Sequence, residues 1–521
     1  MRKLLYNGKK VITVFFLFAF VFFSLFTANA ETPPDTTKEN PTQGTIATKP
    51  VPNYKGLFVI SKDTENSSQN YTSISESENA LLISGGTSTI TNATVNKTGD
   101  CDDKNADFFG TNSAVLTYNG AILNLNDGSV STNGKYANAV FAYKNGTVNL
   151  SDTTIGTSGD YSGGVVVADG GAMSVKNATV STTGNSSAAI KVGKGGGMLT
   201  VNGGTYSTSG TNSPAIYSTA NISVNNAILT STASEGAVVD GANSITLDNV
   251  TLNDTNSNLS ENSETYKNIF LYKSESDVLN TEASKFTAKD SKITTNKGDT
   301  FFVTNTAAEI NLTNNTIVNT SGDFLRIQKG KWGEDGSNGG RVTLNMSNQN
   351  VKGNVIVDDV STLVFNLSNE SVFQGAIDYA DSAKKVSLKL SKDSVVSLTS
   401  DSHIDFLENE DSTNTNIYLN GHKLFVNGLE VSGNNTPYNS ENTETTVEQQ
   451  TQVSEIVTES VTSADKDNNG VDNNLLTIII IVSTAVLIAI LIIVIVSVKK
   501  SHAKEKSSES DGSAPNNEKE N

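Results

Sequence analysis

The stretch SGGVVVADGGAMSVKNATVSTTGNS, residues 162–186, alternates short apolar runs with glycine, asparagine and threonine. Equivalent stretches occupy 112–136, 137–161 and 187–211, so the chain contains four consecutive blocks of 25 residues. A repeat this short cannot bury its own apolar side chains and must stack against copies of itself. The repeat therefore decides the fold.

Each block contains three short apolar segments, separated by turn residues such as Gly120 and Gly146. Apolar and polar residues alternate within the segments, which is typical of strands with one buried face. The glycines and β-branched residues exclude a helical repeat, and the block is too short for a propeller blade. The predicted inward positions are Val115, Val140, Val165 and Ile190 in the first segment, Leu123, Val148, Met173 and Met198 with Leu125, Leu150 and Val175 in the second, and Val130, Ile155 and Val180 in the third.

Three strands per block predict an all-β fold, a right-handed three-strand parallel β-helix with about 25 residues per rung. The pattern loosens at polar insertions near 256–265 and 274–285 and returns in FFVTNTAAEINLTNNTIVNTSGDFLRI, residues 301–327. We expect about fourteen rungs, or roughly 65 Å of stacked strands.

The two ends of such a stack would pair with other chains unless they were covered. We expect residues 52–79 and 404–430 to form caps, so that the β-helix ectodomain, residues 52–432, is monomeric.

Both termini of the chain carry apolar segments. Residues 1–30 combine a basic start, an apolar run and Ala28-Asn29-Ala30, the pattern of a cleavable signal peptide. Residues 475–498 contain no charge and, as a helix of roughly 36 Å, would span a membrane. Four lysines in the tail, 499–521, place that tail in the cytoplasm by the positive-inside rule.

Two polar segments connect these parts. Residues 31–51 are proline-rich and predict an extended N-terminal arm, and residues 433–474 predict a flexible stalk rich in Ser, Thr, Glu and Asn. The predicted localisation is a cell membrane, single-pass, with the ectodomain on a bacterial cell surface. The net charge of −18 argues against nucleic acid as a partner, and Cys101 is the single cysteine.

The chain also resembles a known family. The runs NSAVLTYNGAILNL, PAIYSTANISVNNAILTSTASEGAVVDGANSITLDNVTL and KWGEDGSNGGRVTLNMSNQNVKGNVIVDDVSTLVFNLSN resemble adhesin-like surface proteins with pectate-lyase-type β-helices, from anaerobic gut bacteria and archaea. The resemblance covers residues 80–430 and implies a surface-exposed rod that contacts carbohydrate or another partner. It brings no active-site motif.

The same resemblance makes an enzyme worth testing. Lyases of this fold, as the resemblance implies, bind Ca²⁺ through aspartates and use a basic residue, often arginine, to remove a proton beside a uronate carboxyl. Between residues 31 and 474 the chain has two arginines, Arg326 and Arg341, and no aspartate recurs at one outward position of the blocks. We therefore predict no catalytic residues, no cofactor and no metal site.

A glycine-rich segment, SGDFLRIQKGKWGEDGSNGG at 321–340, is the best binding candidate because it contains the single tryptophan. An exposed indole stacks on sugar faces, and charged neighbours supply hydrogen bonds. The alternative is that the tryptophan packs the loop onto the solenoid. The candidate ligand-binding residues are Trp332, Arg326, Lys329, Lys331, Glu334 and Asp335.

Two acidic segments were weighed as Ca²⁺ sites. GDCDDKNAD, residues 99–107, is read as a solvated turn, and DKDNNGVDNNLL, from Asp465, as linker because Leu476 stands where a calcium loop needs glutamate. The predicted function is a non-catalytic, membrane-anchored, adhesin-like rod that contacts glycans or other surfaces. The alternatives are a polysaccharide-acting lyase or hydrolase and a purely structural envelope protein.

Overall fold

The computed structural model describes residues 52–259, 265–274 and 282–439. The expected signal peptide, arm, transmembrane segment and cytoplasmic tail, with most of the stalk, lie outside these residues. Within the described ranges, no helix is long and apolar enough to cross a membrane. The described residues up to Thr436 form one compact unit, a parallel β-solenoid of the right-handed type with about fourteen turns.

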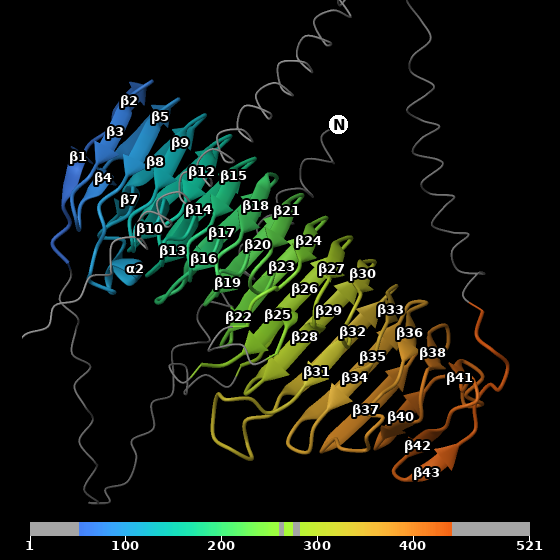
Figure 1. Ribbon diagram of the computed structural model, residues 1–521. Helices are drawn as coiled ribbons and strands as arrows, with labels where there is room; N and C mark the ends of the chain where they lie inside the picture. The colour runs from blue at the N-terminus through green and yellow to red at the C-terminus, as the bar shows by residue number, and fades with distance from the viewer. Residues whose placement is uncertain (1–51, 260–264, 275–281, 440–521) are drawn as a thin grey trace, which may run out of the picture. The chain divides into compact units, whose positions relative to one another are not determined.

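Three parallel sheets run along the solenoid, and successive strands of each lie side by side in chain order (Figure 1). Sheet A contains β1 (Gly56–Ile60), β4 (Asn79–Ile83), β7 (Val115–Tyr118), β10 (Val140–Tyr143), β13 (Val165–Ala168), β16 (Ile190–Val192), β19 (Ile216–Ser218), β22 (Ala237–Asp240), β25 (Lys267–Tyr272), β28 (Asp299–Thr304), β31 (Leu325–Ile327) and β34 (Val355–Val357). Sheet B contains β2 (Thr64–Ser67), β5 (Thr87–Thr91), β8 (Ile122–Asn126), β11 (Thr147–Ser151), β14 (Gly171–Lys176), β17 (Gly197–Asn202), β20 (Asn221–Asn225), β23 (Ser244–Asp248), β26 (Ser284–Lys289), β29 (Ala307–Thr313), β32 (Arg341–Ser347), β35 (Thr362–Ser368), β37 (Lys385–Leu390) and β40 (Phe406–Asn409).

Sheet C contains β3 (Asn70–Ser73), β6 (Thr94–Lys97), β9 (Ser129–Thr132), β12 (Thr154–Thr157), β15 (Thr179–Thr182), β18 (Thr205–Thr208), β21 (Ile228–Ser231), β24 (Thr251–Asp254), β27 (Lys292–Thr295) and β30 (Thr316–Asn319). Toward the C-terminus, β33 (Asn350–Lys352), β36 (Val372–Gly375), β38 (Val395–Leu398) and β41 (Ile417–Tyr418) form a separate four-stranded sheet. The short helix α2 (Ala106–Phe109) lies between β6 and β7.

The 25-residue repeat sets the pairing of the strands, as predicted. Val140 pairs with Val115 on one side and Val165 on the other, and Ile190 continues the column. These side chains are completely buried, because every second residue of a strand points into the solenoid. The predicted all-β parallel solenoid with about 25 residues per turn is confirmed.

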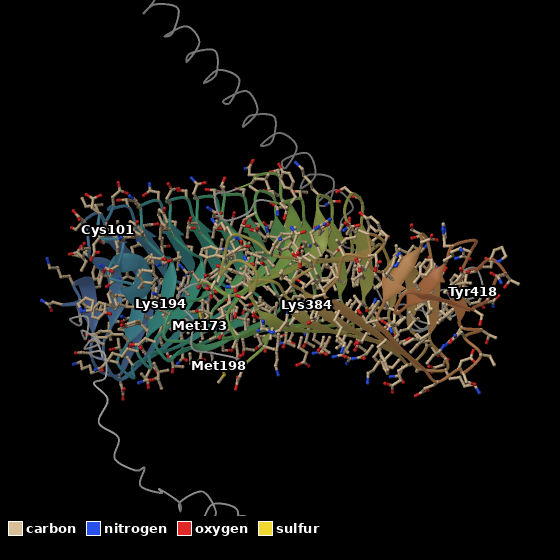
Figure 2. The ribbon with its side chains drawn as sticks, turned by 90° about the horizontal axis from the view of Figure 1, so that it is seen from below. Cys101, Met173, Lys194, Met198, Lys384 and Tyr418 are labelled. Carbon is tan, nitrogen blue, oxygen red and sulfur yellow. The ribbon has the colours of Figure 1, made fainter. Side chains whose placement is uncertain are left out.

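One predicted inward residue is wrong. Met198 is 64% exposed and lies at the outer surface (Figure 2), whereas its neighbour Leu199 is buried and pairs with Met173. The rung from 187 has one extra residue, accommodated by Gly195, Gly196 and Gly197, which all have positive φ. Because side chains alternate between faces, a one-residue shift before the strand exchanges inward and outward positions.

The turns between sheets B and C explain much of the asparagine in the chain. Asn177 lies between β14 and β15 with φ 51°, a left-handed conformation that asparagine and aspartate tolerate better than most residues. Sequence reasoning assigned the turns to glycine alone and missed this position. The equivalent left-handed residues of the other rungs are Ser68, Asn92, Asp127, Asp152, Gly203, Asn226, Asn249, Asp290, Asn314, Asn348 and Asn369.

The expected caps differ at the two ends. Residues 52–79 do not form a cap: β1, β2 and β3 pair with β4, β5 and β6 and so make one further rung. At the C-terminal end, β40 and β41 still extend the parallel sheets. After them, β42 (Leu424–Val426) and β43 (Leu429–Val431) form an antiparallel pair, in a small sheet with β39 (Ser402–Ile404).

Candidate functional site

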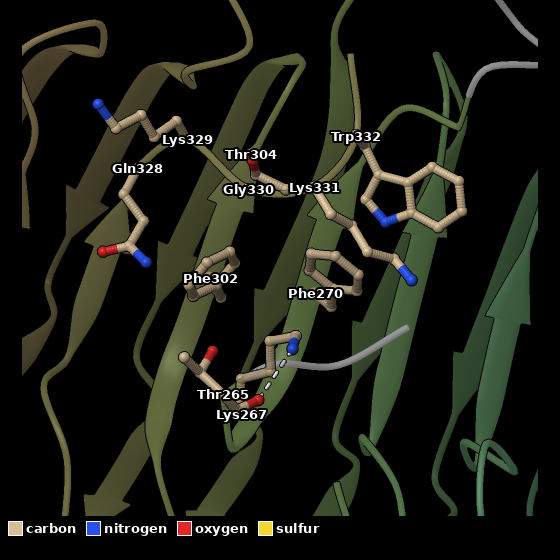
Figure 3. A pocket seen from close by; sticks show the side chains of 10 residues that line it. All are labelled: Thr265, Lys267, Phe270, Phe302, Thr304, Gln328, Lys329, Gly330, Lys331 and Trp332. Carbon is tan, nitrogen blue, oxygen red and sulfur yellow. Dashed lines mark hydrogen bonds between the residues drawn. The ribbon is translucent and has the colours of Figure 1, made fainter. Parts of the chain in front are cut away.

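The predicted tryptophan loop leaves the solenoid between β31 and β32 and folds back onto the outer face of sheet A. The half-buried Trp332 ring lies 5.5 Å from the Tyr272 ring, and it packs against a cluster that includes Phe270 and Phe302 (Figure 3). The Lys331 ammonium lies 5.0 Å from the indole centroid. These contacts favour the packing role that was weighed as the alternative for this tryptophan.

The other predicted residues of this loop are dispersed. Arg326 lies on β31, where its Nε donates to Asp299 at 2.6 Å and a terminal nitrogen donates to Asp323 at 2.5 Å. Burial alone would lower the pKa of Arg326, but the hydrogen bond and charge of Asp299 raise it overall. The guanidinium is therefore committed to the solenoid.

Lys329 and Lys331 do lie close to Trp332, and the three line a cavity of about 30 Å³. The Lys329 ammonium is 3.5 Å from the Asp359 carboxylate. Glu334 and Asp335 are exposed farther along the loop. A cavity of 30 Å³ accommodates about one water molecule and not a sugar ring.

A much larger hollow lies on the outer face of sheet A, and sequence reasoning missed it. It has a volume of about 890 Å³ and crosses β16, β19, β22 and β25, three strand spacings or roughly 14 Å. We call this hollow the sheet A groove. Its lining includes Asp107, Phe108, Tyr161, Lys191, Lys194, Tyr217, Asp240, Asn243, Tyr272 and Ser274.

The groove is bounded by two rows of turns. Tyr161, Ser186 and Asn212 occupy equivalent positions before successive strands of sheet A, each with left-handed φ between 53° and 56°. On the other side, residues that follow the strands, such as Lys194 and Thr219, form the second rim. The repeat thus places equivalent residues along both edges of one continuous hollow.

The two ends of the groove are defined by apolar side chains that cover sheet A. Toward the N-terminus, Tyr54 and Phe109 pack over the outward residues Leu116 and Phe141, which are completely buried. At the other end Trp332 packs on Tyr272, which itself lines the groove. Between these covers, the outward side chains of sheet A line the hollow.

Charged groups in the groove are held by specific partners. The Lys191 ammonium on β16 lies 2.7 Å from the Asp107 carboxylate of α2. The Tyr217 hydroxyl donates to Asp240 Oδ2 at 3.0 Å, and the Ser274 backbone N–H donates to Asp240 Oδ1 at 2.9 Å. Burial, followed by the Asp240 charge, raises the pKa of Tyr217, so its hydroxyl stays protonated and keeps this hydrogen bond.

Aromatic rings are also available on the rim. Tyr161 is 39% exposed, and its ring stacks on Tyr136 of the preceding rung at 4.8 Å. The Lys194 ammonium lies 5.5 Å from the Phe108 ring. The groove therefore combines a flat exposed ring with hydrogen-bonding groups of both charges, the combination that was sought in the tryptophan loop.

The acidic segment 99–107 contributes to this groove through one residue. Asp107 pairs with Lys191, while Asp100 accepts a hydrogen bond from the Lys135 backbone and Asp103 accepts from Asn105. In the part of the chain that the structure describes, no three His, Cys, Asp or Glu side chains form a group that could hold a metal ion. The Asp465 segment lies outside the described residues.

The sequence contained only weak signals of the groove. Tyr136 and Tyr161 recur at the ends of two successive blocks, which could have marked an aromatic row. The Asp107–Lys191 contact joins residues 84 positions apart, and nothing in their spacing predicts it. Comparison of the chain with protein-family models gave no match, and comparisons with curated proteins and with solved structures gave none either.

Proposed function

We propose that this protein is a non-catalytic, adhesin-like surface protein whose solenoid binds glycans in the sheet A groove. The predicted signal peptide and single transmembrane segment would anchor it to the cell membrane with the solenoid outside. The observation that carries the proposal is the groove itself, a hollow of about 890 Å³ with an exposed tyrosine on its rim and polar groups along its floor.

The lining suits a carbohydrate better than an apolar ligand. Sugars present apolar ring faces, which stack on aromatic rings, and hydroxyls, which both donate and accept hydrogen bonds. Tyr161 offers the ring, Lys194 offers donors and Asp240 offers acceptor oxygens. A ligand that follows the groove would meet equivalent turn residues at each rung, which matches a polymer with a repeating unit.

The polysaccharide-acting enzyme remains the alternative, and the groove gives it little support. A glycosidase needs two carboxyl groups on either side of the cleaved bond, one of them able to donate a proton. Here Asp107 is paired with Lys191, and Asp240 accepts hydrogen bonds from Tyr217 and Ser274. Both carboxylates are held as acceptors, which favours binding over proton transfer.

The test is a glycan array probed with purified full-length protein in detergent. We expect binding to one class of polysaccharide, and a loss of at least tenfold in affinity for Tyr161→Ala, since one stacked ring contributes of the order of 1.4 kcal/mol. The control is Lys176→Ala, which changes an exposed residue of sheet B. Binding that survives Tyr161→Ala unchanged, or no binding to any glycan, would contradict the proposal. Depolymerisation of a bound polysaccharide would favour the enzyme instead.

A further inference from the structure

The N-terminal end of the solenoid presents three strands that pair on one side only. β1, β2 and β3 are the terminal strands of sheets A, B and C, so within the described residues their other edges have no strand partner. Apolar side chains are exposed at this edge: Leu57 is 50%, Phe58 41% and Val59 56% exposed. The expectation of a monomeric ectodomain depended on residues 52–79 acting as a cap, and they form this open rung instead.

This edge lacks the features that usually prevent edge-to-edge association. Natural edge strands carry lysines, prolines or bulges that block pairing with another chain. Among the 5, 4 and 4 residues of β1, β2 and β3, Glu65 alone is ionisable at neutral pH. The low charge of the edge is notable in a chain with a net charge of −18, because it removes the repulsion that would keep two copies apart.

The preceding segment of this chain is poorly suited to cover the edge. Residues 31–51 contain four prolines, which have no N–H to donate to a strand, and few apolar side chains. The chain also enters the solenoid at its side: the Tyr54 hydroxyl donates to the Phe109 carbonyl at 3.1 Å, on the outer face of sheet A. A second copy of the same edge is the better match, since it supplies three strands at once.

We propose that two copies of this protein pair end to end through β1, β2 and β3. A two-fold axis through Phe58 would place β1 antiparallel to β1 of the other copy, with Leu57 opposite Val59 across the joint. The same rotation places β2 of one copy over β3 of the other, because these strands lie on either side of β1. Glu65 then faces the uncharged strand β3, and the two glutamates stay apart.

Such a contact is isologous and closes at two copies. It joins the three parallel sheets of each copy into longer sheets and covers the apolar side chains of the end rung. The antiparallel pair β42–β43 ends the other terminus differently, so the contact does not propagate into a filament. The pairing would double the number of sheet A grooves per assembly, but it does not depend on what the groove binds.

Sedimentation of the purified full-length protein in detergent tests this pairing. We expect a protein mass of twice the 55.0 kDa chain for the wild type, and a twofold fall in mass for the double variant Leu57→Lys/Val59→Lys. The matched control, Met198→Lys/Ile228→Lys, changes two exposed apolar residues on the sides of the solenoid and should remain dimeric. A monomeric wild type, a dimer that tolerates the edge lysines, or a series of larger species would each overturn the proposal.

A cysteine variant tests the geometry without relying on disruption. Phe58→Cys lies on the proposed two-fold axis and should form a disulfide between copies under mild oxidation, seen as a dimer band in a denaturing gel without reductant. Met198→Cys is exposed but distant from the joint and should not. Equal crosslinking of the two variants, or none at position 58, would contradict the pairing.

Discussion

The rungs between 112 and 211 and those between 237 and 340 build the same three sheets from different material. In the first region, valine, isoleucine and leucine fill the inward columns at a nearly constant spacing. In the second, long excursions separate the strands, and the interior contains Phe286, Phe301 and Phe324 in edge-to-face contact at 5.5 and 5.7 Å.

The difference shows two ways of keeping one register. Where the repeat is regular, each rung positions the next, and small β-branched side chains stack without gaps. Where the period varies, larger aromatic side chains fill the interior, and buried polar groups appear: Glu235, Asp254 and Lys267 are all less than 10% exposed. Stability should therefore be spread evenly in the regular rungs and concentrated on a few residues in the irregular ones.

The largest expected effect in this comparison comes from Phe301. Phe301→Ala removes a fully buried ring between two others and should lower the free energy of unfolding by about 3–5 kcal/mol. Val165→Ala, at the equivalent inward column of a regular rung, removes two methyl groups and should cost roughly 2 kcal/mol. Urea unfolding followed by circular dichroism measures both. Similar losses at the two positions would break the comparison.

An intermediate effect is expected from the buried carboxyl of Asp254. Burial, and then the nearby Glu235 charge, raises the pKa of Asp254 from 3.8 to about 9. The Lys267 ammonium, 3.6 Å from Glu235, is the positive charge in this group. Between about pH 4 and pH 9 the folded protein retains a proton that the unfolded chain releases, so this carboxyl makes stability fall as pH rises.

Asp254→Asn removes that dependence. The variant should gain stability relative to the wild type as pH increases from 5 to 8, by at most about 1.4 kcal/mol per pH unit. Urea unfolding at several pH values measures the gain, with Asp335→Asn, on the exposed loop, as the control. A constant difference between Asp254→Asn and wild type across this range would show that the buried carboxyl does not hold a proton.

The smallest expected effect on stability comes from Trp332. Because its ring packs on the outer face and not in the interior, Trp332→Ala should lower the free energy of unfolding by about 1 kcal/mol and speed amide exchange only in the loop 328–340. Glycan binding in the groove should be reduced less than by Tyr161→Ala. Loss of most binding in Trp332→Ala would restore the tryptophan loop as the ligand site.

Sequence patterns predicted the solenoid because the period-two alternation and the 25-residue repeat are both local and repeated many times. Val140 and its partners could be placed inward from these two numbers alone. The end rung was harder: β1 follows the same pairing as later strands, but its sequence GLFVI has no equivalent block before it to reveal the repeat.

The groove could not be predicted because its residues meet only through the stacking of rungs. Asp107 and Lys191 come from different elements, and Trp332 reaches Tyr272 across an excursion whose path the sequence does not fix. A tryptophan among glycines predicted an exposed ring, but the apolar outward residues of sheet A, such as Phe270 and Phe302, gave that ring a surface to cover.

The central claim, that strand pairing and not the 25-residue count sets which side chains enter the solenoid, is tested most directly at two adjacent residues. The fixed count points Met198 inward, whereas the structure buries Leu199 and exposes Met198. Thermal and urea unfolding of Leu199→Asp and Met198→Asp compare the two. We predict that Leu199→Asp costs several kcal/mol, because it buries an unpaired charge, and that Met198→Asp stays within about 0.5 kcal/mol of wild type. Equal losses, or a larger loss for Met198→Asp, would contradict the register described above.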